Sequence, residues 1–105
     1  MRRVVITGAG NLSPLGHDWV TVYARLREKK NAVRQFPEWA EYKGLNTRLG
    51  VPVAPFELPD NYNRKSTRSM GRVALMATRA TELALEDAGL LNDPFLKSGR
   101  VGISY

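Results

Sequence analysis

The fold of this chain is decided by a stretch near its start, residues 4–16, which reads VVITGAGNLSPLG. The first part of this stretch is apolar and β-branched without alternation, which is typical of a strand buried on both faces of a sheet. Two glycines follow, and Pro14 prevents the strand from continuing. We therefore predict a strand over Arg3–Ile6 and a glycine-containing loop over Thr7–Gly16.

The glycine spacing raises the question of a dinucleotide-binding loop. Such a loop needs G-x-G-x-x-G, so that the backbone can approach a pyrophosphate at the N-terminus of a helix. Gly8 and Gly10 occupy the first two positions, but Ser13 occupies the third. Pro14 offers no N–H to a phosphate, and no acidic residue follows a second strand at the expected distance. The sequence therefore disfavours a nucleotide-binding function.

Two helices are predicted further along the chain. Asp18 is suited to cap the first, over about Asp18–Glu28, because apolar residues then recur at i, i+3, i+4 and i+7. The second covers about Ser66–Ala88, and its apolar face consists mostly of alanine. Gly89 follows at the position where helices commonly end. The small side chains predict close packing of this helix against a sheet or another helix.

The remaining segments hold short strands and irregular structure. Asn31–Asn63 has prolines and aromatic residues without periodicity, with a possible edge strand at Leu49–Val53. Residues 100–104, RVGIS, indicate a final strand. The order of strand, helix, irregular segment, helix and strand is an α/β pattern. Because two strands do not make an independently stable sheet, we expect this chain to be a piece of a larger α/β unit.

Composition limits the possible functions. The 105 residues are 43% hydrophobic and 25% charged, as in an ordinary globular domain, and the apolar runs are too short for a membrane span or a signal peptide. We therefore expect a cytoplasmic protein. The chain has no cysteine, which excludes a disulfide, a thiolate metal site and a cysteine nucleophile within these residues. Its single histidine, His17, is interpreted as a loop residue near a helix start, so no catalytic or metal-binding residue is assigned.

Four separated segments carry a family pattern. Residues 3–16 follow R-x-V-I/V-T-G-x-G-x-x-S-P-x-G, and residues 63–90 contain R-K-x-x-R-x-M and close with A-L-x-D-A-G-L. LREKKNAV, residues 26–33, and GRVGIS, residues 99–104, agree in the same order. Together they resemble the N-terminal segment of the β-ketoacyl-acyl carrier protein synthases, of the type II elongating kind. The resemblance covers the whole chain.

This resemblance implies a thiolase-like fold, layered α/β/α/β/α, of which residues 1–105 are an incomplete N-terminal portion. It also implies a 3-oxoacyl-[acyl-carrier-protein] synthase, which performs decarboxylative Claisen condensation in fatty-acid or polyketide synthesis. In that family a cysteine takes the acyl chain and two histidines stabilise an enolate, with no cofactor or metal, in a homodimer. These three residues have no counterpart here, so we expect the segment alone to be catalytically incomplete. A non-catalytic chain-length-factor-like partner remains open, because the position that distinguishes it is missing.

Positive charge is concentrated at the start of the second helix. The chain carries a net charge of +6, and no acidic residue lies between Asn61 and Ala80. Arg64, Arg68 and Arg72 recur every four residues, which places them on one face of a continuous helix. The resemblance implies that Arg64, Lys65 and Arg68 contact acyl- and malonyl-loaded acyl carrier protein. The alternative is a solvated charged face.

A small basic nucleic-acid-binding module is the hypothesis from a different class. Its support is the pI near 10.1. Against it, aromatic side chains are not interleaved with the basic residues as a stacking platform for bases requires. We therefore expect neither a nucleic acid nor a membrane as partner.

Overall fold

The computed structural model describes residues 1–104, and the chain divides into two compact units. Met1–Asn11 and the chain from Leu58 onward form the first unit, and Leu12–Glu57 form the second. In residues 1–104 no helix is both long enough and apolar enough to cross a membrane.

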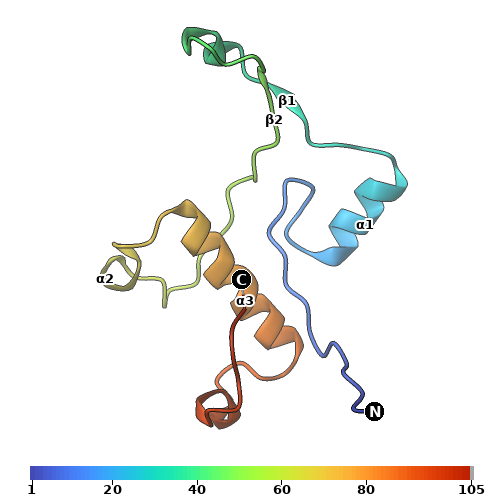
Figure 1. The fold of residues 1–105 in the computed structure, drawn as a ribbon, viewed down its shortest axis with the longest axis vertical. Helices are drawn as coiled ribbons and strands as arrows, with labels where there is room; N and C mark the ends of the chain where they lie inside the picture. Colours follow the sequence, from blue (N-terminus) through green and yellow to red (C-terminus); the bar gives the residue numbers. More distant parts are fainter. Residues whose placement is uncertain (105) are drawn as a thin grey trace. The chain divides into compact units, whose positions relative to one another are not determined.

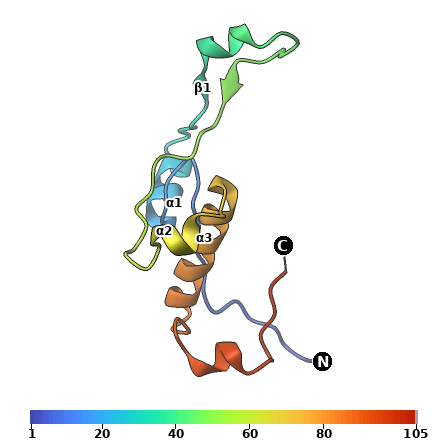
Figure 2. The same cartoon turned by 90° about the vertical axis from the view of Figure 1, so that its left-hand side faces the viewer.

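The first unit is organised around helix α3, Arg72–Asp87. Helix α2, Arg64–Thr67, precedes it, and a 3₁₀ helix, η2, Pro94–Lys97, follows. The N-terminal segment runs along α3 as an extended chain (Figures 1 and 2).

Gly8 and Gly10 of the opening stretch lie against the backbone of α3. A Cβ added at Gly8 would come within 2.6 Å of the Ala88 nitrogen, and one added at Gly10 within 2.6 Å of the Ala84 nitrogen. No side chain fits at either position, because real Cβ contacts are longer. The glycines therefore allow close packing of a loop on a helix. Since α3 covers both α-carbons, this arrangement also argues against a phosphate-binding loop.

The second unit contains α1, Trp19–Arg27, and a short hairpin. The Asp18 carboxylate accepts a 2.8 Å hydrogen bond from the Thr21 N–H and caps α1, as the sequence predicts. In the hairpin, β1, Arg34–Gln35, pairs antiparallel with β2, Leu49–Gly50, and a 3₁₀ helix, η1, Pro37–Glu41, lies between them (Figure 2). Beside β2, the rings of Phe36 and Trp39 stack with centroids 4.5 Å apart.

Two predicted strands are wrong for this structure. Arg3–Ile6 and residues 100–104 are irregular, and within the described chain neither pairs with a strand. Val4 and Ile6 are 93% and 92% exposed, and none of residues 1–104 is buried. A strand forms only where a neighbour completes its hydrogen bonds, and neither unit supplies one here. The edge strand expected at Leu49–Val53 is confirmed only at its first two residues.

The predicted helix Ser66–Ala88 is two helices. Gly71 is extended, with φ −73° and ψ 171°, and serves as the N-cap of α3. The chain turns between Arg68 and Gly71, so Arg72 belongs to α3 and does not continue the row formed by Arg64 and Arg68. The expected helix end is confirmed, since Gly89 has a φ of +68° just after α3.

Candidate functional site

The predicted carrier-protein residues gather in one turn of helix. Arg64 and Lys65 begin α2 and Arg68 ends it, and we call Arg64–Arg68 the basic segment. The Arg68 N–H donates to the Arg64 carbonyl at 3.0 Å, which places these two residues on the same face. The side chains of Arg64, Lys65 and Arg68 are exposed, and within residues 1–104 no carboxylate pairs with them. Their charge is therefore available to an anionic partner.

The basic segment begins at a well-formed helix cap. The Asn63 side-chain oxygen accepts a 3.0 Å hydrogen bond from the Ser66 N–H. The hydroxyls of Ser66 and Thr67 donate back to the Asn63 carbonyl, at 2.9 and 3.0 Å. The Asn63 side chain thus accepts from one of the first-turn backbone N–H groups, which otherwise lack partners, and the two hydroxyl bonds tie the same turn to the Asn63 carbonyl.

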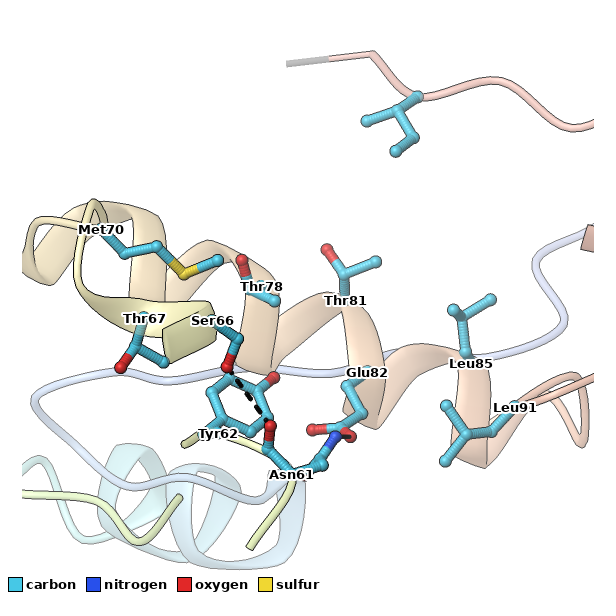
Figure 3. A pocket seen from close by; sticks show the side chains of 11 residues that line it. Asn61, Tyr62, Ser66, Thr67, Met70, Thr78, Thr81, Glu82, Leu85 and Leu91 are labelled. Carbon is cyan, nitrogen blue, oxygen red and sulfur yellow. Dashed lines mark hydrogen bonds between the residues drawn. The ribbon is translucent and has the colours of Figure 1, made fainter. Parts of the chain in front are cut away.

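A polar cluster on α3 holds the chain just before this cap. Glu82 accepts a 3.3 Å hydrogen bond from the Asn61 amide at Oε1 and a 2.5 Å bond from the Arg79 guanidinium at Oε2. The Tyr62 hydroxyl lies close enough to the Glu82 carboxylate for the two groups to shift each other's pKa. Figure 3 shows Asn61, Tyr62 and Glu82 converging from the loop and from the helix. We call Asn61, Tyr62, Arg79 and Glu82 the anchor cluster.

The electrostatics of the anchor cluster favour a charged Glu82. Partial burial raises the pKa of this carboxyl, but hydrogen bonds from Arg79, Tyr62 and Asn61 outweigh it and bring the pKa below the usual 4.5. Burial first, and then the interaction with Glu82, raise the pKa of Tyr62 above 10.0. At neutral pH Tyr62 is therefore protonated and Glu82 is charged.

A hollow of 430 Å³ lies beside the anchor cluster. Tyr62, Glu82 and Leu85 line one part of it, while Thr67 of the basic segment and the nearby Met70 line another part (Figure 3). In the part of the chain that the structure describes, His, Asp and Glu side chains form no group of three that could hold a metal ion. The hollow thus offers hydroxyl groups and apolar surface around one carboxylate.

His17 has the loop position that the sequence predicts. It immediately precedes the α1 cap, and its ring meets Phe56 edge-on with centroids 6.1 Å apart. This contact lies within the second unit.

No expectation from the sequence included the anchor cluster. The three-residue spacing of Arg79 and Glu82 is a readable sign of a helical ion pair. The contact between Asn61 and Glu82 joins residues 21 positions apart, and no local sequence pattern predicts it.

Comparisons with known proteins agree on one family. The family described as "Beta-ketoacyl synthase, N-terminal domain" matches residues 1–104. The chain is 39% identical to Nodulation protein E of Rhizobium meliloti over 85% of its own length and 22% of the relative's. It is 35% identical to 3-oxoacyl-[acyl-carrier-protein] synthase 1 of Haemophilus influenzae, over 98% and 25% of the two chains.

A solved structure agrees with these relatives. A crystal structure of a β-ketoacyl synthase from Burkholderia phymatum matches with a TM-score of 0.90 and 48% identity, covering all of this chain and 26% of the other. The chain thus spans about a quarter of the length of the proteins it matches.

Proposed function

This chain belongs to the β-ketoacyl synthase family, whose N-terminal domain matches residues 1–104, and we propose that the complete protein is a 3-oxoacyl-[acyl-carrier-protein] synthase. The fold is thiolase-like, and this chain is an N-terminal portion of it. The solved β-ketoacyl synthase that matches over the full chain at 48% identity and the named synthases among the relatives support the proposed activity.

The proposed reaction is a decarboxylative Claisen condensation. An acyl group passes from a carrier-protein thioester to a cysteine, malonyl-carrier protein loses carbon dioxide, and the resulting enolate attacks the acyl carbon. The carbon–carbon bond forms as the cysteine thiolate leaves. These 105 residues contain no cysteine and one histidine, so the nucleophile and the two enolate-stabilising histidines belong to other parts of the proposed complete protein.

The proposed role of this portion is to bind the carrier protein. The observation that carries this proposal is the exposure of Arg64, Lys65 and Arg68 in one helical turn, without an acidic partner in residues 1–104. Such a cluster attracts an acidic protein surface and speeds the encounter with it. We propose that it orients the carrier so that its phosphopantetheine arm reaches the reacting groups.

Charge reversal in the complete protein tests this role. Lys65→Glu combined with Arg68→Glu should raise KM for the carrier-protein substrate about tenfold or more, equivalent to at least ~1.4 kcal/mol of binding. The same acyl group on a small thioester, which lacks the carrier protein, should show a much smaller change. Lys43→Glu with Arg48→Glu makes the same change in net charge outside the basic segment. An unaltered KM for the carrier-protein substrate would refute the assignment.

We propose that residues 1–105 form part of one N-terminal domain, although Tyr105 lies outside the described residues. The absence of any buried residue in 1–104 supports this, because a self-sufficient domain needs a core. We also propose a cytoplasmic homodimer, as in the family it resembles, with neither nucleic acid nor membrane as partner. Sedimentation of the complete protein tests the dimer.

A further inference from the structure

We propose that Glu82 is a positioning residue for the basic segment and thereby sets the affinity for the carrier protein. Glu82 itself lies on α3 and carries the wrong charge to attract an acidic partner. It acts through Asn61 and Tyr62, which immediately precede the cap of α2. This inference rests on the proposed carrier-protein role of the basic segment.

Glu82 is the common acceptor of the anchor cluster. Its Oε1 atom accepts a hydrogen bond from the Asn61 amide and its Oε2 atom accepts one from the Arg79 guanidinium, while the nearby Tyr62 hydroxyl lowers its pKa further. The side chains of Glu82 and Arg79 are only 16% and 19% exposed. Hydrogen bonds to a charged acceptor in a partly buried position are stronger than those between neutral groups. One carboxylate thus holds Asn61 by a hydrogen bond and interacts with Tyr62, the next residue of the loop.

The basic segment depends on this attachment because α2 has only four residues. Isolated helices of that length do not form in water, since nucleation costs more than one turn of hydrogen bonds returns. The link from Glu82 continues into the helix. The Ser66 hydroxyl donates to the Asn63 carbonyl at 2.9 Å and shares this hydrogen with the Asn61 carbonyl at 3.4 Å (Figure 3), and the Asn63 side chain caps the same turn. Fixing Asn61 and Tyr62 therefore fixes the direction in which Arg64, Lys65 and Arg68 point.

A kinetic comparison in the complete protein tests the positioning role. Glu82→Gln keeps the size of the side chain but removes the charge that Arg79, Asn61 and Tyr62 share. We expect KM for the carrier-protein substrate to rise about fivefold, with kcat for a small acyl thioester within about twofold of the parent. Glu86→Gln, a change in an exposed carboxylate on the same helix, is the matched control and should leave both values unaltered. An equal loss with both substrates would overturn the positioning role.

Local proteolysis gives a readout that does not depend on the carrier protein. Trypsin cleaves after Arg64, Lys65 and Arg68 only when the segment opens. Glu82→Gln and Tyr62→Phe should each increase cleavage at these sites about threefold or more, while the melting temperature stays close to that of the parent. Tyr62→Phe keeps the test decisive if Glu82→Gln does not fold. Unchanged cleavage in both variants would refute the inference.

The two proposals fail in different ways. If charge reversal at Lys65 and Arg68 leaves KM for the carrier-protein substrate unchanged, the proposed function is wrong, whatever trypsin shows. If charge reversal raises this KM but Glu82→Gln changes neither KM nor cleavage, the positioning role is wrong and the carrier-protein role stands.

Discussion

The backbone N–H of Ala9 donates a 2.9 Å hydrogen bond to the Oδ2 atom of Asp87, joining the glycine loop to the last turn of α3. A carboxylate at a helix C-terminus is unfavourable, because the helix dipole is negative there. The hydrogen bond to Ala9 offsets that cost. It also holds the loop where Gly8 and Gly10 meet the α3 backbone.

Removing the carboxylate of Asp87 should therefore lower the stability of the protein, whereas removing that of its neighbour Glu86 should not. Asp87→Ala loses the bond to Ala9 and should lower the unfolding free energy of the complete protein by about 1 kcal/mol. Glu86→Ala removes an exposed negative charge from the same turn, and should leave the stability unchanged or raise it by about 0.5 kcal/mol. Denaturant titration measures both. Equal losses from the two variants would contradict the role of the Ala9–Asp87 bond.

Because the loop packs closely against α3, we expect a side chain at Gly10 to lower the stability of the protein strongly. A methyl group there would lie 2.6 Å from the Ala84 nitrogen and 2.9 Å from the Leu83 Cβ, so loop and helix would have to separate. We expect Gly10→Ala to destabilise the complete protein by about 2–4 kcal/mol. Gly71→Ala is the comparison, because a Cβ there meets nothing within 4 Å. Its cost should stay below about 1 kcal/mol, the effect of an N-cap change alone. Similar melting temperatures for the two variants would count against this packing.

Features that depend on neighbours in sequence could be predicted, and those that depend on distant partners could not. The Asp18 cap and the Gly89 helix end follow from local chemistry, and the structure confirms both. The expected strand Arg3–Ile6 needs a partner strand that residues 1–104 do not supply. The anchor cluster could not be predicted either, because Asn61 and Glu82 meet only after the chain has turned back on itself.

The break between α2 and α3 shows a second limit. Helical periodicity runs without interruption through residues 66–88, and only Gly71 marks the boundary in the sequence. Glycine is tolerated inside helices, so its presence alone does not predict that a helix ends there. The row of Arg64, Arg68 and Arg72 was therefore an artefact of assuming one helix.

The cap of α1 predicts a pH effect. Hydrogen bonds from the Thr21 N–H and then from its hydroxyl lower the pKa of Asp18 below 3.8. A carboxyl whose pKa is lower in the folded state stabilises that state above its unfolded pKa, and the gain disappears as the pH falls through the folded value. Asp18→Asn does not titrate. The melting temperature of the parent should therefore exceed that of Asp18→Asn by more at pH 6 than at pH 3. A constant difference would contradict this explanation.

The proposed attraction of the basic segment for a carrier protein predicts a dependence on salt. Exposed charges are screened more strongly as the Debye length shortens from about 14 Å to about 4 Å between 50 and 500 mM salt. KM for the carrier-protein substrate should rise several-fold over this range. The variant with Lys65→Glu and Arg68→Glu should lose most of this dependence, while a small thioester substrate should show little with either protein. A salt effect of equal size in parent and variant would contradict the proposed contact.

The cap of α2 allows a test of how much the basic segment depends on the hydrogen bond between the Asn63 side chain and the Ser66 N–H. Asn63→Ala removes the side-chain acceptor of the Ser66 N–H and leaves it only the Asn63 backbone carbonyl at 3.1 Å, whereas Asn63→Asp retains a side-chain acceptor. Loss of an N-cap costs about 1 kcal/mol, which is large for a helix of one turn. We expect Asn63→Ala to lower the amide-exchange protection of Ser66 and Thr67 about fivefold and to raise KM for the carrier-protein substrate. Asn63→Asp should preserve the protection, but its negative charge beside Arg64 should still weaken carrier binding. If both variants kept full protection and the parent KM, then neither the cap nor the charge next to it would matter for the proposed interface.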